Sequence, residues 1–206
     1  MKNNILLTGG SGLLGRELRK YIECEAPSHK SLDITDPVTF NGKYDTIIHC
    51  AAYTEVTLAE TNRWQCFSVN VEGTINLLKD YRNTRFVYIS SEYANNPVNF
   101  YSKTKLAGEL AVEAYCDNYL IVRTLFKPKP FPWNKAFFDQ YTQGDYVDVI
   151  APLIANQIKN WDGASKIIYV GTGRKTMLEL AQKTKPLIIA CSVKDVKGVT
   201  LPKDYL

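Results

Sequence analysis

The stretch Thr8-Gly9-Gly10-Ser11-Gly12-Leu13-Leu14-Gly15 lies between a short apolar run, Asn4–Thr8, and an amphipathic segment, Leu13–Ile22. The run is typical of a buried strand, and the apolar positions of the segment recur at helical spacing. Three glycines spaced three apart permit a tight turn and let a pyrophosphate approach the backbone at the start of a helix. The stretch therefore predicts a dinucleotide-binding strand–turn–helix unit, with an ordinary turn as the alternative.

The rest of the chain alternates short apolar runs with amphipathic segments, which is typical of α/β proteins. Further strands are expected at Thr46–Cys50, Arg85–Ser90, Leu120–Arg123, Tyr146–Ile150 and Lys166–Val170, with a weaker signal between Cys24 and Leu32. Helices are expected at Arg63–Tyr81, Tyr101–Cys116, Ala151–Asn160 and Thr176–Gln182. Because crossovers between parallel strands are right-handed, the simplest fold is a doubly wound parallel sheet of the Rossmann type.

The chain changes character after Thr124. Phe126–Trp133 contains three prolines and is expected to form an extended loop, and the polar tail from Ser192 is expected to be irregular. We expect residues 1–124 to form a dinucleotide-binding core. Residues 125–206 are expected to supply a small, reduced C-terminal substrate region and the last strand and helix of the core, in one compact domain.

Composition and charge narrow the class of protein. The 206 residues are 45% hydrophobic and 22% charged with a net charge of +4. The Lys and Arg residues are dispersed, so a solvated surface is expected and not a nucleic-acid interface. Five widely spaced cysteines argue against a disulfide framework or a zinc site. With neither a signal-peptide pattern nor an apolar run of roughly 18 residues, we expect a cytoplasmic protein without membrane partners.

Ser91, Tyr101 and Lys105 form a candidate catalytic group. The spacing of four residues places Tyr101 and Lys105 on one face of a predicted helix. A tyrosine, whose ordinary pKa is about 10, is a poor acid or base near neutrality, but a nearby ammonium stabilises its phenolate. Tyr101 could then exchange a proton with a carbonyl–alcohol centre whose oxygen Ser91 holds. The alternative is a surface Tyr and Lys on an ordinary helix.

Motifs spread over most of the chain carry a resemblance to a known superfamily. Besides the glycine stretch, they are Leu32-Asp33-Ile34-Thr35-Asp36, His49-Cys50-Ala51-Ala52-Tyr53-Thr54, Val69-Asn70-Val71-Glu72-Gly73, Ile89-Ser90-Ser91-Glu92-Tyr93, Tyr101-Ser102-Lys103-Thr104-Lys105-Leu106-Ala107-Gly108-Glu109, Val122-Arg123-Thr124, Gly144-Asp145-Tyr146 and Val170-Gly171-Thr172-Gly173. With these motifs in this order and spacing, the chain resembles the extended short-chain dehydrogenase/reductase superfamily. Within it, the chain is most similar to the dTDP-4-dehydrorhamnose reductase family of sugar-nucleotide reductases.

The resemblance implies roles for individual residues. Ser91, Tyr101 and Lys105 would be catalytic. The cofactor would be bound by Gly9, Gly12, Leu13, Leu14, Gly15, Asp33, Ile34, Ala51, Ala52, Tyr53, Asn70, Tyr101 and Lys105. The substrate would contact Ser91, Glu92, Tyr93 and Phe126. The implied reaction is hydride transfer to the 4-keto carbon of a nucleotide-linked sugar, with Tyr101 as proton donor.

The end of the expected second strand bears on cofactor choice. An acidic residue there would favour NAD through the ribose 2′-hydroxyl. The chain has Ser28-His29-Lys30-Ser31 instead, and His29 and Lys30 suit a 2′-phosphate. We therefore expect NADP, with NAD possible; the alternative is that both side chains simply face solvent.

Two departures from the family pattern concern the substrate region. The family usually has Ser-Thr-Asp-Tyr where this chain has Ser90-Ser91-Glu92-Tyr93, so the hydroxyl is kept and the acid is longer. After Arg123-Thr124 the family continues with a tryptophan-bearing stretch and a longer substrate region, whereas here the proline loop follows. Phe126 and Trp133 either replace part of the sugar-nucleotide pocket or cap the core, and we favour core packing.

Other interpretations remain open at this point. A dinucleotide-binding regulatory subunit without turnover suits the shortened region, and an epimerase or dehydratase would need an extra acid besides Glu92. His49 is expected to be a packed core histidine, and Asp145 and Asp148 are expected to be solvated or bonded to nearby backbone, with no metal bound. A homodimer through the helices near Arg63–Tyr81 and Tyr101–Cys116 is expected from related folds.

Overall fold

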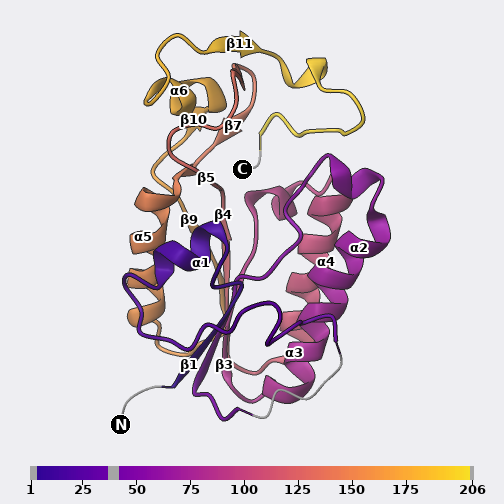
Figure 1. Ribbon diagram of the computed structural model, residues 1–206, viewed down its shortest axis with the longest axis vertical. Helices are drawn as coiled ribbons and strands as arrows, with labels where there is room; N and C mark the ends of the chain where they lie inside the picture. Colours follow the sequence, from indigo (N-terminus) through magenta and orange to yellow (C-terminus); the bar gives the residue numbers. More distant parts are fainter. Residues whose placement is uncertain (1–3, 37–41, 205–206) are drawn as a thin grey trace.

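Parallel strands form the central sheet of the molecule (Figure 1). The computed structural model describes residues 4–36 and 42–204. In spatial order the strands are β1 (Ile5–Thr8), β2 (Thr46–His49), β3 (Arg85–Ile89), β4 (Tyr119–Thr124) and β9 (Lys166–Val170). Each neighbouring pair is parallel. All carboxyl ends therefore lie at one edge of the sheet, where ligands of open α/β sheets bind.

Helices cover both faces of this sheet (Figure 1). One face is packed by α1 (Leu13–Leu18) and α5 (Val147–Lys159), and the other by α2 (Arg63–Phe67), the π-helix η2 (Ser68–Glu72), α3 (Gly73–Tyr81) and α4 (Phe100–Tyr115). Leu6 and Leu7 are both fully buried, and as successive strand residues they enter the cores on opposite faces. The expected doubly wound Rossmann arrangement is confirmed.

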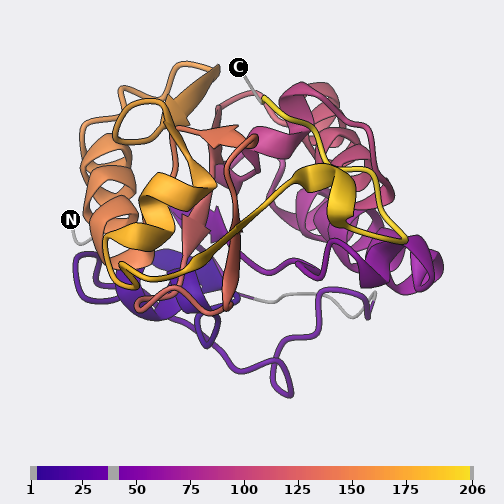
Figure 2. The same ribbon diagram turned by 90° about the horizontal axis from the view of Figure 1, so that it is seen from above.

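Short elements from the second half of the chain build a lobe above the carboxyl edge of the sheet (Figures 1 and 2). They are β5 (Phe126–Lys127), β6 (Lys135–Phe137), β7 (Tyr141–Thr142), β8 (Asp145–Tyr146), β10 (Lys175–Thr176), α6 (Met177–Gln182), β11 (Ile189–Cys191) and η4 (Val193–Asp195). On the sheet side, η1 (Leu58–Glu60) and η3 (Glu92–Asn95) follow β2 and β3. A third apolar cluster joins the lobe to the sheet edge, since it includes Tyr93 of η3 and Leu180 of α6.

Two expected strands differ from the structure. The strand expected between Cys24 and Leu32 is reduced to a single bridge from Glu25 to Leu6, because this polar segment has few apolar residues to bury. The strand expected at Tyr146–Ile150 is wrong beyond Tyr146, since α5 begins at Val147. Its buried residues recur at helical spacing and pack on the α1 side of the sheet, and this packing outweighs their β-branched composition.

Three further observations bear on the sequence expectations. The helix expected over Arg63–Tyr81 is continuous but contains the π-helix η2. The five cysteines are all free thiols. Across residues 4–36 and 42–204, no helix is both long and apolar enough to cross a bilayer.

Candidate active site

The turn after β1 is shaped by its glycines. Gly9 has φ +68°, and a Cβ at this position would lie 2.6 Å from the backbone N of Ala51. A Cβ at Gly15 would lie 2.3 Å from the carbonyl oxygen of Gly9. The Gly12 N–H donates to that same oxygen at 2.9 Å. The turn is therefore too tight for side chains at Gly9 and Gly15, and it follows β1 at the carboxyl edge of the sheet. We call this turn the glycine cradle.

His49 at the end of β2 is a core residue, as expected. It is 1% exposed, and its Nδ1 and Nε2 are hydrogen-bonded to the hydroxyls of Thr8 (2.7 Å) and Thr74 (3.1 Å). Burial lowers the pKa of His49 to about 3, so the ring stays neutral at physiological pH. The histidine links β1 to α3 below the cradle and has no open nitrogen for a ligand.

Ser91 and Tyr101 meet where β3 ends and α4 begins. Ser91 caps η3, its Oγ accepting from the Tyr93 N–H at 3.2 Å. Burial raises the pKa of Tyr101, and the nearby Ser91 hydroxyl opposes this rise only in part. In this state the phenol keeps its proton, which suits a proton donor.

Lys105 lies one turn after Tyr101 on the same side of α4. Its ammonium donates to the Ile89 carbonyl at 2.9 Å and lies 4.2 Å from the centre of the Tyr88 ring. Burial lowers the pKa of Lys105 to about 8, although Glu109 opposes the shift. Among the described residues Ile89 is the ammonium's hydrogen-bond acceptor, so two further N–H groups are left for a ligand.

Asn70 lies within η2 and holds the loop after β2. Its Oδ1 accepts from the Tyr53 N–H at 2.8 Å, while its Nδ2 donates to the Tyr53 carbonyl at 3.2 Å and to the Thr104 hydroxyl at 3.0 Å. The side chain is 1% exposed and is thus fully used by the protein. Asn70 supports the site from its helix by fixing Tyr53 against α4.

The residues expected around the adenosine end differ in exposure. His29 and Lys30 are exposed, and His29 Nε2 lies 3.5 Å from Asp33 Oδ2. Hydrogen bonds from the N–H and hydroxyl of Thr35 lower the pKa of Asp33. Ile34 is 4% exposed and packs beside Gly73 of α3. Its side chain thus belongs mainly to the core, and the ligand roles of all four residues stay predictions.

The residues expected to contact the substrate are not equally free to do so. Glu92 is 1% exposed, and its carboxylate accepts from the Thr142 hydroxyl at 2.6 Å and from the Gln143 N–H at 3.2 Å. Burial raises the pKa of Glu92, and these two hydrogen bonds offset part of the rise. The carboxylate therefore ties the lobe to the sheet edge, and a sugar contact through it is not supported. Tyr93 packs edge-on against the Tyr101 ring, with centroids 6.1 Å apart.

The two aromatic residues of the proline loop behave differently. Phe126 is half-buried and packs against the α1–α5 core. The favoured core packing is wrong for Trp133, which is 53% exposed, because Phe131 fills the core at this place and Trp133 contacts it edge-on from outside. The Lys127 ammonium lies 4.8 Å from the centre of the Trp133 ring, and burial lowers the pKa of Lys127 to about 8.

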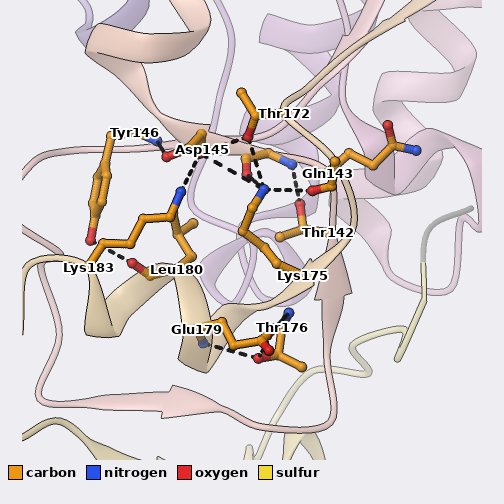
Figure 3. Close-up of polar contacts among 12 residues, drawn as sticks. Thr142, Gln143, Asp145, Tyr146, Thr172, Lys175, Thr176, Glu179, Leu180 and Lys183 are labelled. Carbon is orange, nitrogen blue, oxygen red and sulfur yellow. Dashed lines mark hydrogen bonds and ion pairs between the residues drawn. The ribbon is translucent and has the colours of Figure 1, made fainter. Parts of the chain in front are cut away.

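Asp145 is the centre of a polar cluster that holds α6 to the sheet (Figure 3). Its Oδ2 accepts from Lys183 and from the Thr172 hydroxyl, both at 2.7 Å, and Lys175 lies 3.9 Å away. Burial alone would raise the pKa of Asp145, but these hydrogen bonds outweigh it and the pKa is lowered. The expectation that Asp145 is solvated is wrong, whereas its bond from the Tyr146 N–H is the expected local backbone contact.

Asp148 lies three residues beyond Asp145 and is exposed, as expected. Its carboxylate is paired with Lys129 at 2.9 Å. Within the part of the chain that the structure describes, no cluster of His, Cys, Asp or Glu suits a metal ion. Both aspartates therefore have structural partners that account for them.

Some supporting residues were not identified from the sequence. Thr104 contacts Asn70 and Thr142 contacts Glu92, each across a large sequence separation, whereas Cys66 contacts Asn70 from one helical turn before it. The spacing of Thr104, three residues after Tyr101, was the only available signal. The others become visible only when the helices and the lobe pack together.

A Rossmann sheet, a glycine cradle and a Ser–Tyr–Lys group at one edge are together the arrangement of the extended short-chain dehydrogenase/reductases. The match to known families narrows this class. Residues 1–152 match the family described as "RmlD substrate binding domain", and the chain belongs to that family.

Individual relatives agree with this assignment. A dTDP-4-dehydrorhamnose reductase of Mycolicibacterium smegmatis is 30% identical over 201 residues, covering 85% of this chain and 57% of the relative. A probable dTDP-4,6-dihydroxy-2-methyloxan-3-one 4-ketoreductase of Streptomyces antibioticus is 28% identical, covering 90% of this chain and 77% of the relative. The chain thus spans little more than half the length of the first of these.

A solved structure is similar over the whole fold. The Bacillus anthracis dTDP-4-dehydrorhamnose reductase in complex with NADP matches with a TM-score of 0.86 and 25% identity. The match covers 100% of this chain and 89% of that one. The match therefore includes the lobe above the sheet as well as the sheet itself.

Proposed function

We propose that the chain is an NADPH-dependent reductase of the 4-keto group of a nucleotide-linked sugar. The observation that carries the proposal is the meeting of three groups at the carboxyl edge of the sheet. Ser91 lies at the end of β3, Tyr101 lies in the first turn of α4, and the Lys105 ammonium is bound to the Ile89 carbonyl one helical turn further on. A protein that only binds a dinucleotide needs the cradle but not this group. The relatives named as reductases support the same reaction class.

The residues at the cradle fit a dinucleotide. A Cβ at Gly12 would meet only the Gly9 carbonyl oxygen, at 3.1 Å, so a pyrophosphate would approach the backbone at this glycine. Ala51 and Ala52 line the next strand end with small side chains. The two N–H groups left on Lys105 would hold the nicotinamide ribose, and when bound the reduced nicotinamide supplies the hydride.

The chain's own residues would manage the proton. Ser91 and Tyr101 would hold the keto oxygen between their hydroxyls, and Tyr101 would give it a proton as the alcohol forms. The positive charge of Lys105 would stabilise the phenolate left on Tyr101. Tyr93, Phe126 and the lobe would exclude water from this centre.

His29 and Lys30 support NADP over NAD in this proposal. Both are exposed at the end of the segment that replaces the second strand, where a 2′-phosphate would lie. Asp33 faces His29 and lessens the positive charge, so NADH remains a usable but weaker cofactor.

Removal of one hydroxyl tests the reductase. Tyr101→Phe should reduce turnover of nucleotide-linked 4-keto-6-deoxy sugars by at least about a hundredfold and leave the Kd for NADPH within about twofold. The loss of NADPH absorbance reports the first quantity and fluorescence titration the second. Full turnover in Tyr101→Phe would remove Tyr101 from the role of acid.

A second candidate is a dinucleotide-binding subunit without turnover. Such a subunit would need only the glycine turn after β1, where the backbone leaves no room for side chains at Gly9 and Gly15. NADPH binding without oxidation on any nucleotide-linked keto sugar would support this candidate. An epimerase or dehydratase is less well supported, because it would need an acid besides Glu92, and the Glu92 carboxylate is already hydrogen-bonded to Thr142 and Gln143.

We propose further that residues 1–124 bind the cofactor and that residues 125–206 mainly bind the substrate. We also propose that the chain works in the cytoplasm, where free thiols persist.

A homodimer through α2 and α4 is also proposed. Trp64 is 73% exposed and stacks on Phe67, and Leu110 on α4 is 57% exposed. Sedimentation of the wild type and of Trp64→Arg tests the dimer, which the substitution should dissociate.

A further inference from the structure

The C-terminal segment from Gly198 to Lys203 runs between the lobe and α4. Because α4 carries Tyr101 and Lys105, we call it the catalytic helix. In Figure 1 the yellow chain leaves η4, passes above α2 and α4 and returns toward the middle of the molecule, and Figure 2 shows it on the side of α4. We call residues 198–203 the tail segment. Its place above the carboxyl edge of the sheet is the place where a substrate would enter.

The tail segment is hydrogen-bonded to both parts that it joins. The Asn99 Nδ2 donates to the Thr200 carbonyl at 3.0 Å, and Asn99 is the residue that caps α4 just before Tyr101. On the lobe, the Gln140 Nε2 donates to the Pro202 carbonyl at 3.1 Å and the Tyr141 N–H to the Lys203 carbonyl at 2.8 Å. Gln140 is 1% exposed, so its amide is held in place for this bond.

Leu201 lies between these hydrogen bonds and points its side chain into the apolar cluster of the sheet edge. The same cluster contains Tyr93 and receives Tyr101 and Val56. Leu201 therefore shares an apolar environment with the ring that carries the proposed proton donor. A substrate on Tyr101 would lie beside this side chain.

The opposite side of the tail segment is not packed. There it forms one wall of a groove of about 470 Å³, whose other walls include Glu60, Arg63, Phe100 and Lys103. Its position is set from the other side, by the amide donors of Asn99 and Gln140, by Leu201, and at its end by the Tyr141 N–H and the ion pair of Lys203 with Asp139.

We propose that the tail segment is a wall of the substrate cleft, and that Asn99 and Gln140 are positioning residues that hold it against the catalytic helix. This inference rests on the proposed reductase function and adds to it the residues that set substrate affinity. Bound substrate and the seated tail segment stabilise each other in this arrangement, whereas the cofactor lies below, at the glycine cradle.

The two roles of Asn99 can be separated by substitution. Its Oδ1 accepts from the Ser102 N–H at 2.8 Å as a helix cap, and its Nδ2 holds the tail segment. Asn99→Ser keeps a capping oxygen and removes the tail donor. Gln140→Met removes the second donor at similar volume. Asn160→Ser is the matched control, since Asn160 also donates its amide to a backbone carbonyl, that of Asn156, but at the far end of α5.

The first measurement is steady-state kinetics with the sugar nucleotide that the wild type reduces. Each tail variant should raise the KM for the sugar about threefold to tenfold, and the double variant Asn99→Ser/Gln140→Met should raise it further. The kcat and the Kd for NADPH should stay within about twofold, and Asn160→Ser should match the wild type. An unchanged KM in the double variant, or a Kd for NADPH that rises in step with KM, would overturn the inference.

The hydrogen-exchange rate of the Tyr141 amide measures directly whether the tail segment is held in place. The Tyr141 amide should exchange at least about tenfold faster in the double variant, and thymidine diphosphate should slow it in the wild type. The Thr172 amide, which bonds Gln143 in the same lobe, should not change. Equal rates at Tyr141 in the wild type and the double variant would contradict the tether.

The proposed function and this inference fail in different ways. A wild type that neither reduces a nucleotide-linked keto sugar nor binds thymidine diphosphate would overturn the reductase proposal and this inference with it. Turnover by the wild type with an unchanged KM in the double variant would overturn this inference alone.

Discussion

At the scale of single residues, substitutions in the glycine turn should distinguish a loss of folding stability from a loss of NADPH binding. Gly12 has φ −70°, which any residue adopts, and a Cβ there would lie 3.1 Å from the Gly9 carbonyl oxygen. At Gly15 the same distance would be 2.3 Å. Gly12→Ala should thus be tolerated by the fold, whereas Gly15→Ala must displace the backbone of the turn.

We predict that Gly12→Ala weakens NADPH binding by at least about tenfold while the unfolding free energy stays within about 0.5 kcal/mol of the wild type. The reason is that the added methyl occupies the space of a pyrophosphate. Gly15→Ala should weaken binding and lower stability together. Fluorescence titration and urea unfolding measure the two effects, and tight NADPH binding by Gly12→Ala would place the dinucleotide elsewhere.

Lys105 is the residue that should set the alkaline limit of function. Its pKa of about 8 means that the ammonium becomes a neutral amine as the pH rises through 8. The neutral amine no longer stabilises a phenolate at Tyr101, so kcat/KM should fall about tenfold for each pH unit above 8. NADPH binding should weaken over the same range, and Tyr101→Phe should show this too.

The control for this pH dependence is Lys105→Met, which has no titrating group at this position. Its activity should be lower by about a hundredfold or more, and its NADPH affinity should no longer change between pH 7 and pH 9. A decline in affinity above pH 8 that persists in Lys105→Met would assign the titration to another group.

At the scale of elements, the π-helix η2 is the feature that places Asn70. The wider turn falls within a long helix, and π-helical turns of this kind often occur at functional sites. Here it brings a buried amide to the backbone of Tyr53 and to Thr104 of α4. One side chain thus joins the loop after β2, its own helix and the catalytic helix.

Asn70→Leu should lower the free energy of unfolding by about 2–3 kcal/mol, since it leaves the N–H and carbonyl of Tyr53 without their partner. Turnover should fall as well, because the loop beside the cradle loses its support. Asn156→Leu on the exposed face of α5 is the control and should change stability by less than about 0.5 kcal/mol. Equal urea midpoints for Asn70→Leu and the wild type would show that the loop is held by other contacts.

The elements also show what could be predicted from the sequence. The glycine stretch and the buried runs predicted the sheet, because a strand buried on both faces reads as a continuous apolar run. Val147–Ile150 misled the prediction, since its β-branched residues suit a strand until α1 and the sheet provide a helix-shaped surface to bury them. The spacing of Tyr101 and Lys105 predicted that they lie one turn apart on a helix, and both are in α4, whereas the contacts of Glu92 and Asp145 could not be predicted. Their partners, Thr142 and Lys183, lie 50 and 38 residues away, and nothing in the local pattern indicates them.

At the scale of the whole molecule, two buried carboxylates join the lobe to the sheet edge. Glu92 leaves the end of β3 and binds Thr142 of β7. Asp145 of β8 binds Thr172, just after β9, and Lys183, just after α6. The Glu92 bond lies next to Ser91, so the position of the lobe is set relative to the Ser91 hydroxyl. A change at either carboxylate should therefore alter stability and substrate binding together, while the cofactor cradle stays intact.

Asp145→Asn tests this junction through its pH dependence. The folded-state pKa of Asp145 lies below the ordinary value of 3.8, so its stabilising effect is fully present above pH 3.8 and is lost as the pH falls through the folded pKa. At pH 7 the substitution should lower the free energy of unfolding by about 1–3 kcal/mol, since Asp145 is buried but Lys183 is half exposed.

Asp148→Asn is the control. It breaks an exposed pair with Lys129 and should lower the free energy of unfolding by less than about 1 kcal/mol. Urea unfolding at pH 7, 5 and 3 should show the deficit of Asp145→Asn shrinking at the lowest pH. A deficit that is the same at all three would mean that the carboxylate's charge does not hold the lobe, and that its shape and hydrogen bonds are sufficient.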